Sequence, residues 1–304
     1  MPDNRLIVRS FPKDIEKNKM ASLKEIKERI NSVSSTRKIT SAMKMVSAAK
    51  LHKSQAAIVG MGPYSRALSQ VMEGLLAGAT LDFPLTAHRE VERVAIVAFS
   101  SDSSLCGAFN TNVARLLSER VAEYRHLPAE SVEVYTVGKK VFEAAGKAGY
   151  NVVENFDGLA AKPDYDVMAA LAQRFMDRFV EGTLDRVEIV YHRFKSAGSQ
   201  VLTHSELLPL ELPQTEESGL GADYILEPSR EELLATLLPK SVKLQLYTAL
   251  LDSSASEHAA RVIAMQMATE NADELLSELT VEYNKSRQQA ITNELLDIVG
   301  GSMN

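Results

Sequence analysis

The sequence of 304 residues has no tryptophan, one cysteine and few aromatic residues of any kind. A single cysteine, Cys106, excludes a disulfide within the chain and a metal site built from several thiolates. No apolar run reaches the ~18–20 residues that a membrane-spanning helix needs. The first nineteen residues mix acids with bases and have no apolar centre, so they resemble neither a secretory signal nor a transit peptide. We expect residues 1–21 to form a disordered extension.

Acidic residues are absent from one long stretch near the start of the chain. Between Glu28 and Glu73 there is no Asp or Glu, whereas seven Lys or Arg residues lie there. The segment from Ser229 to Asn304 has the opposite bias, with eleven acids and six bases. In a chain of net charge −6, this asymmetry indicates pairing with another chain or with the other end of the same chain. We therefore expect no nucleic acid partner.

The N-terminal part of the chain has the periodicity of a helix. Ser22 and Glu25 form a capping box, which marks a helix start. The apolar residues that follow are spaced by three and four, as in a coiled coil: Leu23, Ile26, Ile30 and Val33. We predict a helix over residues 22–78 with a kink near residues 60–63, where the sequence is GMGP.

The C-terminal part predicts a second long helix, over residues 229–300. Ser229 is a good N-cap, and Pro239 is tolerated as the first residue of a new helix. No further Pro or Gly occurs before Gly300, which leaves about sixty residues, or roughly 90 Å of helix. A domain of this size has no core of that length, so the helix must pair with another element.

Pairing of the two ends in an antiparallel coiled coil would give each helix a partner for its apolar seam. If their proline breaks lie at one level, the numbers of facing residues sum to about 302. This register places four basic residues level with four acidic ones: Lys24 with Glu278, Arg29 with Asp273, Lys44 with Glu257, and Lys50 with Asp252. The C-terminal helix would then continue alone for about twenty residues, to an apolar last turn.

The middle of the chain, residues 90–210, alternates strands with helices. Apolar runs predict strands at Val91–Phe99, Val132–Val137, Tyr150–Phe156, Arg186–Phe194 and about Gln200–Leu207. Helical patterns separate them at Ala108–Arg125, Lys139–Gly149 and Tyr165–Glu181. The fold class is therefore α/β: a Rossmann-like domain with a mainly parallel sheet, joined to the coiled coil. Residues 211–228, rich in Glu, Ser and Gly, are predicted to form an exposed loop.

The segment SSDSSLCG follows the first predicted strand, a position where phosphates often bind. It has one glycine and matches neither G-x-G-x-x-G nor the P-loop motif with its lysine. Cys106 has no organised His or Asp near it in the sequence. We therefore expect no catalytic residue, no bound cofactor and no metal site in this chain.

Three stretches resemble the gamma subunit of F-type ATP synthases. They are LKEIKERINSVSSTRKITSAMKMVSAAKLHKSQ near the start, SSDSSLCGAFN after the first strand, and MATENADELLSELTVEYNKSRQQAITNELLDIVGG at the end. The resemblance covers nearly the whole chain from Met20. It implies a rotor shaft of paired terminal helices inside a hexamer of alpha and beta subunits. It also implies an α/β foot domain against the epsilon subunit and the membrane-embedded c ring.

The resemblance also implies which residues contact partners. The positions that match beta-subunit contacts are Met43, Arg261, Arg287, Gln288, Thr292 and Glu294. The positions that match c-ring contacts are Tyr224 and Glu227. One departure is that relatives commonly have Arg-Gly where this chain has Ser103-Ser104, so the positive charge of those relatives is missing there.

Taken together, these patterns favour a non-catalytic subunit that couples ion-driven rotation to ATP synthesis or hydrolysis. As a gamma subunit without a visible transit peptide, it would be peripheral to the cytoplasmic face of a bacterial inner membrane. The alternatives are a stand-alone α/β enzyme with a helical dimerisation arm and a coiled-coil scaffold. The enzyme needs a substrate loop for which no motif is found, and the scaffold leaves the apolar C-terminal turn unexplained.

Overall fold

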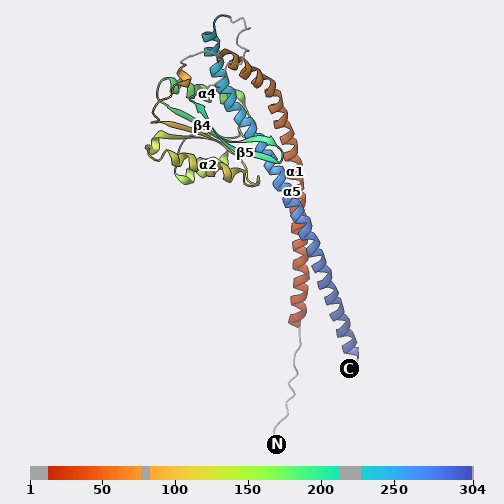
Figure 1. The fold of residues 1–304 in the computed structure, drawn as a ribbon. Helices are drawn as coiled ribbons and strands as arrows, with labels where there is room; N and C mark the ends of the chain where they lie inside the picture. Colours follow the sequence, from red (N-terminus) through yellow and green to blue (C-terminus); the bar gives the residue numbers. More distant parts are fainter. Residues whose placement is uncertain (1–12, 77–82, 212–226, 303–304) are drawn as a thin grey trace. The chain divides into compact units, whose positions relative to one another are not determined.

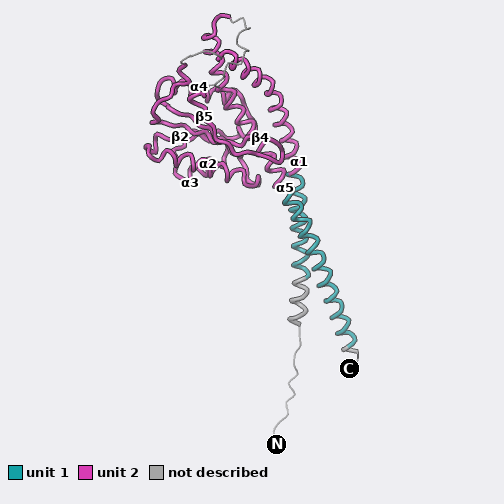
Figure 2. Tube along the Cα trace, viewed as in Figure 1, with its two compact units in different colours: residues 1–43, 265–304 teal, residues 44–264 magenta. Residues whose placement is uncertain are grey.

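The computed structural model describes residues 13–76, 83–211 and 227–302 (Figure 1). Two long helices, α1 (Lys13–Leu76) and α5 (Arg230–Ser302), stand at the two ends of an α/β segment. The described residues divide into two compact units (Figure 2). Unit 1 consists of the chain up to Met43 and from Met265, and unit 2 is Lys44–Ala264, so that both long helices contribute to both units.

Both long helices run without interruption through their prolines. Pro63 lies inside α1 and Pro239 lies inside α5, so the prediction that a new helix begins at Pro239 is wrong. A proline removes one helical hydrogen bond and crowds the preceding turn. Packing offsets this cost in α5, because Leu238 and Val242, on either side of Pro239, are almost fully buried. Helix α1 begins at Lys13 rather than at Ser22; residues 1–12 of the expected extension lie outside the described residues.

Unit 1 is an antiparallel pair of helical segments. The hydroxyl groups of Thr40 and Thr269 lie 2.8 Å apart, and Arg37 forms an ion pair with Asp273. On α5 the buried positions repeat every seven residues, at Met265, Ala272 and Leu279. On α1, Ile26 and Thr40 are buried, with Ile30 and Val33 half-buried between them. This is the seam that the spacing of apolar residues predicts.

The predicted register of this pair is wrong by about one heptad. The two observed pairs, Arg37 with Asp273 and Thr40 with Thr269, have sums of 310 and 309 instead of about 302. A slip of seven residues returns the same faces of both helices to the seam, so the apolar pattern does not distinguish the two registers. The prolines do not mark breaks to align either, because neither ends its helix.

Unit 2 contains a five-stranded sheet in the order β3-β2-β1-β4-β5. The strands are β1 (Val94–Phe99), β2 (Val132–Val137), β3 (Asn151–Phe156), β4 (Arg186–Ser196) and β5 (Ser199–Leu208). The first four are parallel, and β5 is antiparallel to β4. The turn from Ser196 to Ser199 is too short for a parallel crossover, which explains the one antiparallel strand. The predicted α/β class with a mainly parallel sheet is confirmed.

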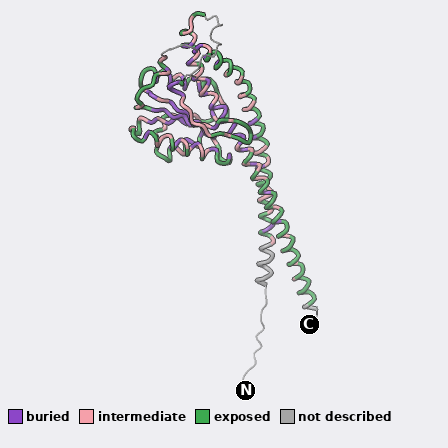
Figure 3. Tube along the Cα trace, in the orientation of Figure 1, coloured by how far each residue is buried: buried purple, intermediate pink, exposed green. Residues whose placement is uncertain are grey.

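Helices cover both faces of this sheet. Side chains of β1 alternate: Val94, Ile96 and Ala98 pack with α2 (Phe109–Glu123) and α3 (Lys139–Ala148). The intervening residues of β1 pack with α4 (Tyr165–Val180) and with the parts of α1 and α5 that belong to unit 2. Figure 3 shows most of the buried residues in the α/β part of the chain. Strand β1 is buried along its whole length, whereas β3 has no buried residue. The segments of α1 and α5 that belong to unit 2 are therefore part of the core of the α/β domain.

Candidate partner-contact surfaces

The C-terminal segment of α5 presents polar side chains to solvent. Arg287, Gln288, Thr292 and Glu294 are all exposed, within two turns of the helix. The Thr292 hydroxyl donates to the Gln288 backbone carbonyl at 2.9 Å, so it is satisfied within its own helix. The structure thus places all four of these predicted contact residues on one short, exposed segment of α5.

Beyond these residues α5 exposes an apolar end. Four large aliphatic residues between 57% and 69% exposed lie there: Leu295, Leu296, Ile298 and Val299. Apolar residues on several sides of a helix are typical of a segment that another protein surrounds. The predicted apolar end of the C-terminal helix is confirmed, because these four side chains are exposed.

Met43, the contact candidate on α1, is half-buried in unit 1. The same helix carries small polar residues whose hydroxyls turn back on the backbone. Ser35 and Thr36 donate to the carbonyls of Asn31 and Ser32, at 2.9 and 3.1 Å. Each of these hydroxyls has used its one donor within the helix and keeps only acceptor capacity for a partner. This stretch of α1 therefore offers an exposed, polar surface.

Arg261 occupies a different setting from the other candidates. It is 8% exposed, and its Nε donates to Glu257 Oε1 at 2.9 Å. Its Nη2 also bonds Glu257 and donates to the Ser103 hydroxyl at 2.9 Å, and its Nη1 donates to the Ser104 carbonyl. Most of its donors are used inside unit 2. The Glu257–Arg261 spacing of four residues was a visible signal for this pair that our sequence analysis did not use.

Glu257, expected beside Lys44, forms ion pairs with Arg261 and His258. Burial opposes ionisation of Glu257, but hydrogen bonds and charge interactions with His258 and Arg261 hold its pKa below the usual range. The carboxylate therefore stays charged and balances the buried guanidinium.

The loop after β1 is filled by its own side chains rather than shaped for a phosphate. The Ser101 backbone N–H and hydroxyl both donate to Asn110 Oδ1, at 3.1 and 3.0 Å. Asn110 Nδ2 lies 3.2 Å from Cys106 Sγ, and Cys106 is 1% exposed. Burial raises the pKa of the Cys106 thiol. A protonated, enclosed thiol is a poor nucleophile, and the groups nearest the loop are already paired.

The pKa values of two buried acids in unit 2 are shifted in opposite directions. Burial of Glu188 is outweighed by hydrogen bonds from His204, Arg120 and Tyr124, which lower its pKa to about 2. Burial raises the pKa of Asp252 to about 6, because Arg193 and a backbone N–H compensate only in part. Glu188 therefore stabilises the folded chain at neutral pH, whereas ionised Asp252 destabilises it.

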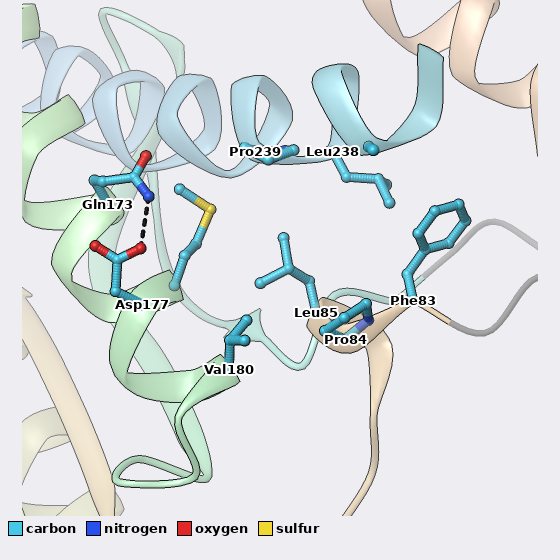
Figure 4. Close-up of a pocket in the computed structure, with 10 residues that line it drawn as sticks. Phe83, Pro84, Leu85, Gln173, Asp177, Val180, Leu238 and Pro239 are labelled. Carbon is cyan, nitrogen blue, oxygen red and sulfur yellow. Dashed lines mark hydrogen bonds between the residues drawn. The ribbon is translucent and has the colours of Figure 1, made fainter. Parts of the chain in front are cut away.

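A cavity of about 260 Å³ opens between α4, α5 and the short 3₁₀ segment Pro84–Thr86 (Figure 4). Its lining is mostly apolar and includes Phe83, Leu85, Leu238 and Pro239. The polar side chains in the lining are Gln173 and Asp177, which hydrogen-bond to each other at 2.8 Å. Without cationic groups, this cavity is unsuited to a nucleotide.

The described ranges contain no group of three or more His, Cys, Asp or Glu side chains able to hold a metal ion. Within the same ranges, no helix is long and apolar enough to cross a membrane. Of the two predicted c-ring contacts, Glu227 is exposed, and Tyr224 lies outside the described residues.

The family model and the most similar known proteins point to the same family. A family model described as ATP synthase matches residues 22–303. The ATP synthase gamma chain of Bacteroides fragilis (strain ATCC 25285) is 55% identical over 289 residues, covering 93% of this chain and all of the relative. That of Flavobacterium psychrophilum is 46% identical over 287 residues, covering 93% and 98%.

Solved structures show the same fold. In the rotor of the Euglena gracilis mitochondrial ATP synthase, in rotational state 1, a chain matches with a TM-score of 0.63 at 21% identity. The match covers 89% of this chain and 99% of that one. A chain in the OSCP/F1/c-ring structure of the same enzyme matches with a TM-score of 0.65 at 22% identity, covering 93% and 94%.

Proposed function

This chain belongs to the ATP synthase gamma chain family and is a central-stalk subunit, and we propose how its surfaces serve that role. The paired helices of unit 1 are the part that turns inside a hexamer of alpha and beta subunits. Unit 2 engages the epsilon subunit and the c ring. Rotation driven by ions through the c ring is thereby coupled to ATP synthesis or hydrolysis in the hexamer.

The observation that carries this proposal is the exposed end of α5. Polar residues of two helical turns and an apolar tip lie on one helix, and the four tip residues are each more than half exposed. Exposed aliphatic side chains in water are unfavourable by roughly 25 cal/mol per Å² of apolar surface. An apolar sleeve formed by other subunits would bury them.

The chain itself has no catalytic role in this proposal. Phosphoryl transfer needs a phosphate cradle, a metal ligand and charge stabilisation. The loop after β1 is occupied by Ser101, Asn110 and Cys106, and the cavity near Pro239 is apolar. These features support a mechanical subunit over the alternative of a stand-alone α/β enzyme.

The contacts with beta subunits are assigned to two surfaces. Met43 faces an acidic beta loop from α1, and the α5 group Arg287, Gln288, Thr292 and Glu294 meets a second beta loop. A surface that must pass several partners in turn cannot bind one deeply, since each buried large side chain stabilises a contact by ~1.5–3 kcal/mol. Small polar residues on α1, whose hydroxyl donors are used within their own helix, keep such contacts exchangeable.

Contact with the c ring is assigned to Tyr224 and Glu227, on the segment that precedes α5. The relatives compared include bacterial gamma chains. We accordingly assign the protein to the cytoplasmic face of the bacterial inner membrane, where it is held peripherally through the c ring.

Replacing Arg287 and Gln288 together by Ala tests the assignment. The isolated double variant should melt like the wild type, because both side chains are exposed. The reconstituted alpha–beta complex should hydrolyse ATP more slowly with the variant than with the wild-type chain. The matched control is Asn284→Ala with Lys285→Ala, two exposed residues one turn earlier that are not assigned to a contact. ATP hydrolysis by the wild-type chain alone would overturn the rotor proposal, and equal rates for both variants would remove Arg287 and Gln288 from the contact surface.

A further inference from the structure

The cavity between α4, α5 and the 3₁₀ segment Pro84–Thr86 has walls built mostly from apolar side chains (Figure 4). Leu85, Met176 and Leu238 in its lining are buried, whereas Val180 is 56% exposed, so the lining reaches the surface there. All the lining residues belong to unit 2. A cavity of roughly 150 Å³ with aliphatic walls binds benzene. The volume of about 260 Å³ therefore suits a body of about ten non-hydrogen atoms.

The polar groups in this lining are mainly hydrogen-bond acceptors. Gln173 Nε2 donates to Asp177 Oδ1 at 2.8 Å. The second carboxylate oxygen of Asp177 and the amide oxygen of Gln173 remain as acceptors. Pro239 lies inside α5 and has no backbone N–H, so the carbonyl of Ala235, four residues earlier, lacks its usual helical donor. Ala235 and Pro239 both line the cavity, which adds a backbone acceptor to its wall.

The charge of the lining is negative. Asp177 lies in the last turn of α4, where the helix dipole favours cations and disfavours acids. Within the described ranges, Asp177 has no ion-pair partner, because both arginines of α4 pair with acids of the sheet. Arg174 lies 2.6 Å from Glu154, and Arg178 lies 2.7 Å from Glu133. The lining therefore carries one acidic side chain and no basic one.

We propose that this cavity binds a small amphiphilic ammonium ion, with one primary amine on an aliphatic or aromatic body of about ten non-hydrogen atoms. The body packs against the apolar walls, and the ammonium group brings a positive charge and three N–H donors to a lining that is rich in acceptors. An anionic ligand would be repelled by Asp177, and a hydrocarbon would leave the acceptors without donors. The proposal concerns the chain by itself and does not depend on the rotor function.

Calorimetric titration of the purified full chain tests the ligand class with three probes of similar size. The dissociation constant of 2-phenylethylammonium should be roughly 0.1–1 mM. The neutral 2-phenylethanol should bind about tenfold more weakly, because it lacks the charge-assisted hydrogen bonds. The anion 3-phenylpropanoate should show no binding at the same concentrations. Added salt should weaken binding of the ammonium probe and leave binding of the alcohol unchanged.

Three variants locate the site. Asp177→Asn keeps the shape of the side chain and removes its charge, so it should weaken ammonium binding about tenfold and leave alcohol binding unchanged. Ala235→Leu fills the cavity and should abolish binding of both probes. Leucine is a good helix former, and Ala235 is exposed, so this variant should melt close to the wild type. Asp166→Asn is the matched control, an exposed acid of α4 outside the lining, and it should bind both probes like the wild type.

The outcomes separate the possible occupants. Equal affinities for the ammonium and alcohol probes, with no effect of Asp177→Asn, would make this a site for neutral apolar ligands and overturn the proposal. Binding that survives Ala235→Leu would place the probe elsewhere and also overturn it, as would no ammonium binding up to ~10 mM. Asp177 is exposed, so Asp177→Asn decides the question even if Ala235→Leu lowers the melting temperature. None of these results bears on the rotor function, which is measured in the assembled complex.

Discussion

The register of the helix pair in unit 1 can be tested with engineered disulfides. Thr40 and Thr269 have their hydroxyls 2.8 Å apart, so cysteines at these positions place two sulfurs within reach of a bond. The residues are 229 positions apart in the chain. Closing a loop of that length stabilises the folded state by about 5 kcal/mol in the chain-entropy account. Oxidised Thr40→Cys/Thr269→Cys should therefore migrate faster on a non-reducing gel and melt higher than the reduced form.

The matched control is Arg29→Cys with Asp273→Cys, the pair that the 302 register makes level. Asp273 pairs instead with Arg37, eight residues from Arg29, which is ~12 Å along a helix axis. That distance exceeds the ~7 Å limit between the Cα atoms of a disulfide, so the control should stay reduced. A cross-link in the control but not in the first pair would refute the observed register. In the proposed function the two helices turn as one body, so the oxidised first variant should still support ATP turnover in the reconstituted complex.

Three further substitutions test the electrostatics and the shaft surface. The pKa of Glu188 falls from 4.5 to about 2 on folding. The ionised carboxylate therefore stabilises the folded state by ~3 kcal/mol above pH 4.5, and this stabilisation is lost as the pH falls towards 2. In denaturant titrations, Glu188→Gln should lower the free energy of unfolding by about this much at pH 7 and by little near pH 2. The pKa of Asp252 rises from 3.8 to about 6, so its ionisation weakens the folded state as the pH rises from 4 to 6; Asp252→Asn should raise the melting temperature at pH 8 but not at pH 3, and equal effects at both would contradict this sign. Met43→Lys should disturb coupling more than folding, because the new cation would pair with an acidic beta loop and stabilise one rotary state by ~1–3 kcal/mol. Exit from that state would slow by about fivefold to more than a hundredfold. Unchanged ATP turnover and unchanged ion pumping per ATP in the assembled complex would argue against this effect.

Much of the fold follows from local sequence. The strand at Val132–Val137 has the predicted bounds, and the bounds of the other four strands differ from prediction by at most three residues. Short apolar runs rich in Val and Ile, separated by amphipathic helices, leave few alternatives to a parallel α/β sheet. The exposed residues at the end of α5 could likewise be predicted, because an apolar turn beyond the end of a coiled-coil seam has no partner within its own chain.

The sequence alone determined the family resemblance, the two long helices, the α/β class and the periodic seam. Only the tertiary structure decided the register, because a heptad slip leaves every apolar contact on the same face and the choice depends on pairs such as Thr40 with Thr269. It also decided the setting of Arg261, which is paired inside unit 2 through contacts with residues more than 150 positions away. Spacing along one helix shows which residues share a face, but not which distant loop that face meets. That depends on how the sheet and the helices pack.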